Sequence, residues 1–258
     1  MYSLSENNNN ENTILKSIST FYKEYGVGKA LKKANVYKAK GFPVMEVFMY
    51  VLQLVFTKKS MYMNLKNGTH NANFAKDAVY RFLKSPFINW NVFILTVSLN
   101  LISKLKTLTS ESRINAIVVD DTFFGRERSK KVELLANVHD HASKGTKYKK
   151  GFRLLTLGWT DGVSFIPLLF RHLSSTNKKN RYNEINPDID KRSCGYKSRL
   201  QAISTSPKVL LGFLEMITKT SLPAKHVLFD SWFSYPAMII SISKLKLSTV
   251  ARLKILQK

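Results

Sequence analysis

The chain has 258 residues, 44% hydrophobic and 12% aromatic, which is typical of a folded protein with a sizeable core and excludes a fully disordered one. Its 41 lysines and arginines outnumber 17 aspartates and glutamates, a formal net charge of +24. This charge favours a polyanionic partner, foremost nucleic acid, over ribosome association, membrane-surface binding or a proteome-wide lysine bias. The single cysteine, Cys194, excludes an intrachain disulfide and a multi-cysteine zinc site.

The N-terminal residues 1–12 are polar and rich in asparagine, and we expect them to form a disordered tail. They lack the basic start and apolar run of a secretory signal. The apolar run from Val44 to Phe56 is interrupted by Glu46 and Gln53 and is too short to span a bilayer. We therefore expect a cytoplasmic protein without a membrane partner.

Residues 13–109 carry a helical pattern. From Val44 to Phe56 apolar residues recur every three or four positions, and Pro43 is expected in the first turn of this helix. Further amphipathic stretches cover residues 73–83 and 89–105, with lysines between them. We predict an all-helical N-terminal domain that binds DNA, although a plain helical bundle has the same pattern.

The pattern changes at residue 110, and we assign residues 110–258 to a second domain. The run from Ile114 to Val119 is apolar at both parities, which predicts a central strand buried on both faces. Two carboxylates, Asp120 and Asp121, are expected to end this strand. Because both faces are apolar, the alternation does not decide which of the two faces a site.

The rest of the second domain predicts a mixed sheet flanked by helices. Elements of this order, with two neighbouring strands that each end in a carboxylate, are typical of an α/β domain of the ribonuclease-H-like class. In such a sheet the first and fourth strands are adjacent, so Asp120 and Asp230 can meet despite their wide separation in sequence. The expected elements are a hairpin of residues 151–159 and 163–170 turning at 160–162, a flexible loop over 174–197, a helix over 197–220 interrupted near Pro207, a strand over 225–229 ending in Asp230, and a helix within 231–244.

Carboxylates at two strand ends suit divalent cations. Magnesium prefers oxygen ligands, and two ions about 3.5 to 4 Å apart can activate the attacking oxygen and stabilise the leaving oxygen of a phosphodiester. Asp120 and Asp230 are the predicted ligands. A lone aspartate at a strand end more often caps a helix or opens a turn, but two of them in a chain so poor in acids favour a site.

Three segments resemble the IS4-like DDE transposases. Val118-Val119-Asp120-Asp121-Thr122 resembles their first-Asp motif, Val227 to Ser234 their second-Asp motif, and Gly151 to Gly162 their central hairpin. The resemblance covers about residues 30 to 255 and implies a ribonuclease-H-like catalytic domain, two Mg²⁺ or Mn²⁺ ions, and cleavage and joining of double-stranded DNA at transposon ends, with a homodimer on DNA as one arrangement. The Asp-x-Thr spacing favours Asp120 as the metal ligand, with Asp121 as the alternative.

The chain departs from that family in one respect. The resembling enzymes supply a third carboxylate, a glutamate, from a helix well downstream of the second aspartate, whereas Ser231 to Lys258 contains no Asp or Glu. We therefore expect a catalytic domain that is incomplete at its C-terminus and inactive as given. The alternative is a catalytically silent DNA-binding remnant that recognises transposon ends.

Basic residues beside the two motifs are candidate contacts to DNA phosphates, although a solvated charge run has the same appearance. Trp159 and Trp232 can stack on a splayed base, but large aromatics at strand ends more often belong to the core. His139, Asp140 and His141 are adjacent and need a third, distant ligand to bind a metal. A phosphatase of the haloacid dehalogenase type needs Asp-x-Asp, and Thr122 excludes it. The candidate phosphate contacts are Arg126, Arg128, Lys130, Lys131, Lys191, Arg192, Lys197 and Arg199.

Overall fold

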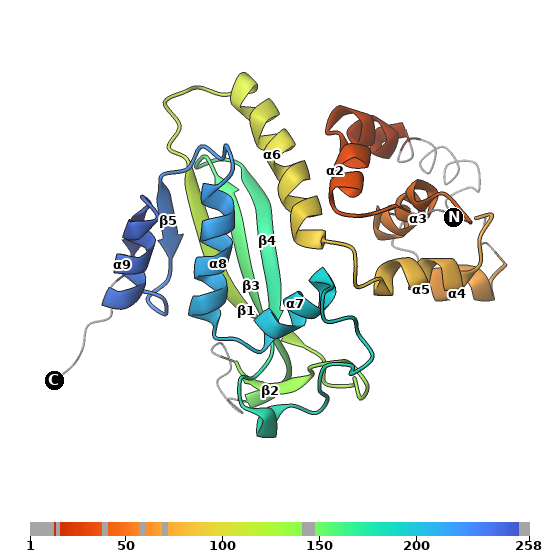
Figure 1. The fold of residues 1–258 in the computed structure, drawn as a ribbon. Coiled ribbons are helices and arrows are strands. Elements are labelled where there is room, and N and C mark those ends of the chain that lie inside the picture. Colours follow the sequence, from red (N-terminus) through yellow and green to blue (C-terminus); the bar gives the residue numbers. More distant parts are fainter. Residues whose placement is uncertain are drawn as a thin grey trace, which may run out of the picture. The chain divides into compact units, whose positions relative to one another are not determined.

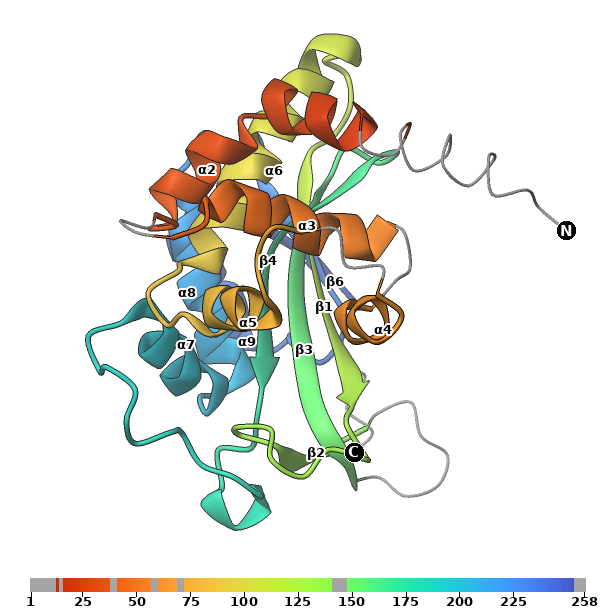
Figure 2. The ribbon, with the colours of Figure 1, turned by 90° about the vertical axis from the view of Figure 1, so that its right-hand side faces the viewer.

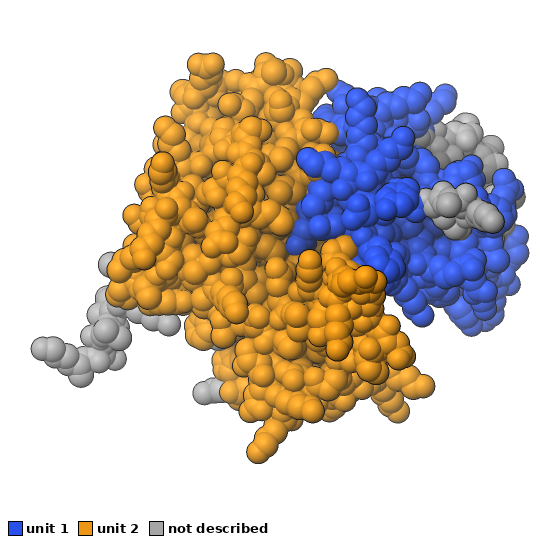
Figure 3. All heavy atoms as spheres, viewed as in Figure 1, with its two compact units in different colours: residues 1–93 blue, residues 94–258 orange. Residues whose placement is uncertain are grey.

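The computed structural model describes residues 13, 16–37, 41–56, 60–68, 72–140 and 148–252. Contacts divide the chain into two compact units, Met1–Phe93 and Ile94–Lys258, coloured separately in Figure 3. The division falls within helix α6 (Trp90–Leu108), so this helix contributes to both units. The domain boundary expected at residue 110 stays a prediction. No helix in the described part of the chain is long and apolar enough to cross a membrane.

The first unit is helical, as the spacing of its apolar residues predicts. A small core of Val47, Phe74, Ala78 and Val79 packs its helices together. Pro43 precedes its helix rather than lying in the first turn, and its carbonyl accepts a hydrogen bond from the backbone N–H of Glu46 at 3.1 Å. The labelled helices are α2 (Val27–Lys33), α3 (Val44–Phe56), α4 (Met61–Lys66) and α5 (Lys76–Lys84).

The second unit contains a mixed sheet. Among the described residues the sheet has six strands in the order β2-β3-β1-β5-β6, and β4 also pairs with β3. The β1–β3, β2–β3 and β3–β4 pairs are antiparallel, and β1–β5 and β5–β6 are parallel. The strands are β1 (Ala116–Gly125), β2 (Ala136–His139), β3 (Tyr148–Thr160), β4 (Phe165–Leu173), β5 (His226–Phe229) and β6 (Ser248–Ala251).

Three helices, α6, α8 (Ser206–Thr218) and α9 (Pro236–Lys244), lie on one side of this sheet (Figures 1 and 2). Their apolar side chains form one core with the side chains that β1 and β3 direct to this side, among them Ile117, Leu157 and Trp159. Trp159 is 1% exposed and therefore belongs to the core. The predicted ribonuclease-H-like α/β class is confirmed, with the strand of Asp120 next to the strand that precedes Asp230.

Strand β1 differs from its predicted extent in one way that matters for the site. Asp120 and Asp121 do not end β1, which continues to Gly125, because β3 pairs with it along its whole length as far as Gly125↔Gly151. The parallel neighbour is shorter, and its last pair with β1 is Val118↔Leu228. The two aspartates therefore lie where β1 continues beyond β5.

The segment between β4 and α8 was expected as a flexible loop followed by a helix interrupted near Pro207. The segment is a loop up to the start of α7, and hydrogen bonds attach it to the rest of the unit: the N–H of Tyr182 donates to the carbonyl of Leu135 at 2.7 Å, and the Asn183 amide donates to the carbonyl of Lys130 at 2.9 Å. The interruption is present, since α7 (Cys194–Ala202) ends before α8 begins with Pro207 in its first turn.

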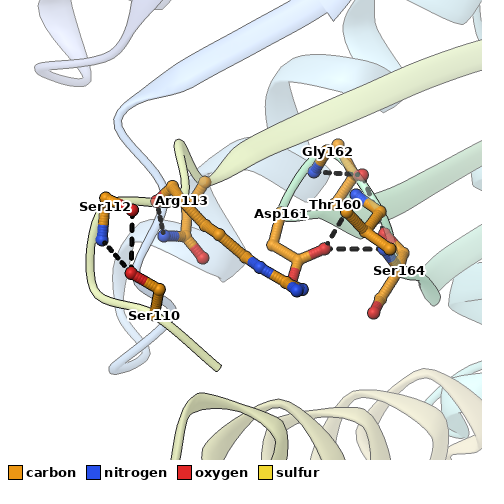
Figure 4. A network of polar contacts seen from close by, with 9 residues as sticks. Ser110, Ser112, Arg113, Thr160, Asp161, Gly162 and Ser164 are labelled. Atoms are coloured by element: carbon orange, nitrogen blue, oxygen red, sulfur yellow. Dashed lines mark hydrogen bonds and ion pairs between the residues drawn. The ribbon is translucent and has the colours of Figure 1, made fainter. Parts of the chain in front are cut away.

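The hairpin that joins β3 to β4 is closed by a polar network around Asp161 (Figure 4). One carboxylate oxygen accepts hydrogen bonds from the backbone N–H groups of Val163 at 3.1 Å and Ser164 at 2.6 Å. The other pairs with the Arg113 guanidinium at 2.6 Å. The Ser164 N–H and Arg113 hydrogen bonds, with smaller help from the Val163 N–H and the charge of Arg113, lower the pKa of Asp161 to about 2. This network ties the start of β1 to the end of β3.

Candidate active site

Asp120 and Asp121 point to opposite sides of the sheet because side chains alternate along a strand. Asp121 pairs with Leu155, which is fully buried, and shares the helix-covered side with Val119. Asp120 pairs with Thr156 and lies on the other side, where it is exposed. The environments of the two carboxylates therefore differ, which the apolar pattern of the sequence alone left open.

Arg153 of β3 binds the Asp121 carboxylate through two hydrogen bonds. Its Nε donates to Oδ1 at 3.1 Å, and its Nη2 donates to Oδ2. The Asp121 side chain is 7% exposed and that of Arg153 18%, so solvent screens this pair only weakly. The guanidinium carbon also lies 5.3 Å from the ring centroid of Trp232, a cation–π distance. Arg153 thus contacts residues from both acid-bearing motifs.

Asp230 follows β5 directly and is exposed. Its carboxylate accepts a hydrogen bond from the backbone N–H of Trp232 at 3.0 Å, which forms the turn after the strand. Pairing of β1 with β5 ends at Val118↔Leu228, and the same register continued by two residues sets Asp120 level with Asp230. Neighbouring strands lie about 4.8 Å apart, so a pairing that continued in this register would bring the two residues within reach of a shared cation, which stays a prediction.

The chemistry of these side chains fits a hard divalent cation. Among the described residues none forms a hydrogen bond or ion pair with the Asp120 carboxylate, and Asp230 accepts only the Trp232 N–H. Both therefore have carboxylate oxygens available for Mg²⁺ or Mn²⁺. The described residues contain no group of three or more histidine, cysteine, aspartate or glutamate side chains arranged for a metal. The roles of Asp120, Asp230 and Asp121 as ligands stay predictions.

A cleft of about 390 Å³ opens beside Arg153 and Trp232. Tyr148 of β3 and Asn137 of β2 line it, together with the hydroxyls that precede α8, including that of Thr205. Trp232 is 42% exposed, so its ring has an accessible face at this cleft. The stacking of Trp232 on a splayed base stays a prediction, and the cleft that its side chain lines is the space where such a base would lie.

The basic residues predicted to contact DNA fall in two segments that the fold connects. Glu133 accepts hydrogen bonds from Arg199 at 2.7 Å and from the backbone N–H of Asn186 at 2.7 Å, which joins the β1–β2 connection to the segment around α7. Arg199 is therefore engaged within the protein. The remaining seven, Arg126, Arg128, Lys130, Lys131, Lys191, Arg192 and Lys197, are exposed and define what we name the basic surface. Their contact with DNA stays a prediction.

The surroundings of β4 are electrostatically positive. Burial lowers the pKa of His172, and the positive charges of Arg126 and Arg171 lower it further. Burial also lowers the pKa of Arg171 to about 10.

Of the candidate metal group at residues 139–141, Asp140 pairs with Lys149 at 2.8 Å, and His141 lies outside the described residues.

Sequence reasoning missed Arg153 and Glu133. Arg153 was visible as a charge inside an otherwise apolar strand, which is a signal for a buried ion pair. Its partner follows only from the register Phe123↔Arg153, which sets Arg153 diagonally across from Asp121. Glu133 gave no comparable signal, because it lies in a charged connection whose path is fixed by tertiary contacts.

The chain matches a family model described as DDE superfamily endonuclease over residues 45–256. The chain belongs to this family. No curated protein matches it. Among solved structures it is similar to one titled "Crystal structure of a pre-cleavage Mos1 transpososome", with 13% identity over 83% of this chain and 61% of that chain, so it spans about three-fifths of that transposase's length. The TM-score is 0.19.

Proposed function

We propose that this DDE superfamily endonuclease is a DNA transposase of the IS4-like kind, which cuts and joins strands at the inverted-repeat ends of an insertion sequence. The observation that supports the proposal is the parallel pairing of β1 with β5, which ends at Val118↔Leu228 and, if continued by two residues, would set Asp120, exposed and without a partner among the described residues, level with Asp230. The partner is double-stranded DNA, with two copies of the chain acting on it at the nucleoid of a bacterium.

Each part of the second unit has a role in this proposal. Asp120 and Asp230 would hold Mg²⁺ or Mn²⁺, with Asp121 as the alternative to Asp120. Two such ions, when bound, stabilise the attacking and leaving oxygens of a phosphodiester. The basic surface binds the DNA backbone and displaces its counterions, which makes binding strongly dependent on salt. The Trp232 ring offers a stacking face beside the scissile strand.

The test is nicking of supercoiled plasmid carrying the element ends, measured with Mg²⁺ or Mn²⁺. Any metal-dependent nicking by the chain should be lost in Asp120→Ala and in Asp230→Ala, because each removes a proposed ligand. Asp188→Ala is the matched control, since Asp188 is an exposed carboxylate whose side chain forms no described contact. Nicking that persists in both ligand variants contradicts the proposal.

A second function is a catalytically silent DNA-binding protein that occupies transposon ends. It is favoured by one observation, that the described residues hold no metal-binding group of three side chains. Both functions give salt-sensitive DNA binding. Binding without nicking at any metal concentration supports the second function, whereas metal-dependent nicking that requires Asp120 supports the first.

A further inference from the structure

The strand pair that carries the two candidate ligands is weakly constrained at its end. β5 has four residues, and its described pairs with β1 stop at Val118↔Leu228, two residues before the carboxylates. The spacing of Asp120 and Asp230 therefore depends on side-chain contacts beyond the last backbone pair. Arg153 supplies such contacts, since it binds Asp121 next to Asp120 and lies over Trp232 next to Asp230.

We propose that Arg153 is a positioning residue that clamps the β1 acid motif to the turn after β5 and thereby fixes the spacing of Asp120 and Asp230. Its guanidinium forms a bidentate contact with Asp121, and its central carbon lies over the Trp232 ring, 5.3 Å from the ring centroid. This inference rests on the proposed function, because spacing matters only if the two carboxylates act on the same cations.

Arginine is suited to this task in a way that lysine is not. A planar guanidinium can present two parallel N–H groups to a carboxylate while its face lies on an aromatic ring. An ammonium forms single contacts and leaves one of the two partners unheld. We therefore expect Arg153→Lys to retain the charge but to rescue the clamp only in part.

The chain offers a matched control at the other end of the same strand pair. Arg113 also pairs with an aspartate, Asp161, at 2.6 Å, and this pair also ties β1 to β3. It lies at the hairpin end, away from Asp120 and Asp230. A variant that lacks Arg113 therefore loses an ion pair of the same chemistry without touching the clamp.

The first experiment measures Mn²⁺ binding by electron paramagnetic resonance on the full chain. We expect Arg153→Gln to raise the Kd for Mn²⁺ about 10- to 100-fold, the range for losing a residue that orients metal ligands. Arg153→Lys should give an intermediate value, and Arg113→Gln should leave Kd unchanged. Equal Kd values for Arg153→Gln and Arg113→Gln, with both variants folded by circular dichroism, overturn the inference.

The second experiment reports the spacing without any metal. Asp120→Cys and Asp230→Cys are combined in a Cys194→Ser background, since a disulfide forms when Cα atoms lie about 4.4 to 6.8 Å apart. We expect rapid disulfide formation under mild oxidation, slower formation when Arg153→Gln is added, and an unchanged rate when Arg113→Gln is added. An unchanged rate with Arg153→Gln overturns the clamp.

The two proposals fail in different ways. If no disulfide forms even with Arg153 intact, the adjacency of the carboxylates is wrong, and the proposed function fails together with the clamp. If the disulfide forms and Asp120→Ala abolishes Mn²⁺ binding, while Arg153→Gln changes neither the rate nor Kd, only the clamp fails.

Discussion

The two ends of the β1–β3 ladder use the same chemistry for different results. At the hairpin end Arg113 pairs with Asp161, whose carboxylate also accepts two backbone N–H groups, so its hydrogen-bonding capacity is used within the fold. Toward the other end, four pairs before Gly125↔Gly151, Arg153 pairs with Asp121, but the preceding residue, Asp120, is exposed and accepts no hydrogen bond among the described residues. The carboxylate at the hairpin end is fully bound within the protein, whereas the other region keeps one carboxylate available to bind a ligand.

This difference indicates where a ligand is expected. In a chain of net charge +24 an aspartate can readily find a cationic partner, and Asp121, Asp140 and Asp161 all do. Asp120, by contrast, is exposed and has no partner among the described residues. Its carboxylate oxygens are accessible, as those of a metal ligand must be, which is consistent with the proposed role of Asp120.

The largest expected loss of stability comes from replacing a glycine of the β1–β3 ladder with alanine, which adds a methyl group. In Gly151→Ala the new Cβ would collide with the Phe124 carbonyl oxygen and crowd the Cα of Gly125, and backbone atoms cannot turn aside. We expect a loss of about 3 kcal/mol in the free energy of unfolding, measured with urea. In the control Gly158→Ala the collision is with the ring of Phe165, which is 55% exposed and can rotate, so the loss should be smaller. Equal losses contradict this account.

Removing each arginine in turn should give the next largest effect. Arg153→Gln takes the cation from Asp121, a carboxylate only 7% exposed, and we expect a loss of about 2 to 3 kcal/mol. Arg113→Gln should cost less, about 1 kcal/mol, because Asp161 retains the N–H groups of Val163 and Ser164. Thermal or urea unfolding of both variants measures the difference, and a larger loss for Arg113→Gln reverses the ranking.

Acid should weaken the hairpin end in a defined pH range. The pKa of Asp161 is about 2 in the folded protein, below its ordinary value of 3.8, so its stabilising contribution is complete above pH 3.8 and is lost as the pH falls through about 2. Asp161→Asn cannot titrate. The stability difference between the natural chain and this variant should be constant from neutral pH to about 4 and then shrink. A difference that persists at pH 2 contradicts the lowered pKa.

The sequence predicted the layout of the fold better than its details. Long periodic segments such as Val44–Phe56 were recovered as helices, although Pro43 lies before the helix and not in its first turn, because the amphipathic pattern repeats with the period of a helix. β2 and β6 were missed, since each has four residues and is defined by its neighbour in the sheet. The extent of β1 beyond Asp120 was missed for the same reason, because β3 determines it.

The candidate site was predictable as residue types but not as environments. Two apolar strands followed by aspartate were enough to select Asp120, Asp121 and Asp230. The sequence could not separate Asp120 from Asp121, since both parities of that strand are apolar. Register separates them, because it directs Asp121 to Arg153 on the helix-covered side and leaves Asp120 on the other.

The smallest effect on stability should come from the basic surface. Here an exposed arginine can be compared with an arginine that is bound within the protein. Arg192 is 92% exposed, and among the described residues its side chain contacts only Asp190, so Arg192→Gln should leave the stability nearly unchanged. If Arg192 contacts a phosphate, the slope of log K for DNA against log salt should fall by about 1. Arg199 is held by Glu133 and by the carbonyl of Gly195 at 3.1 Å, so Arg199→Gln should reduce stability and leave the salt slope unchanged. Fluorescence anisotropy with labelled duplex over a salt series measures both slopes. Equal slopes for the two variants would mean that exposure does not distinguish the DNA-contacting arginines from the structural one.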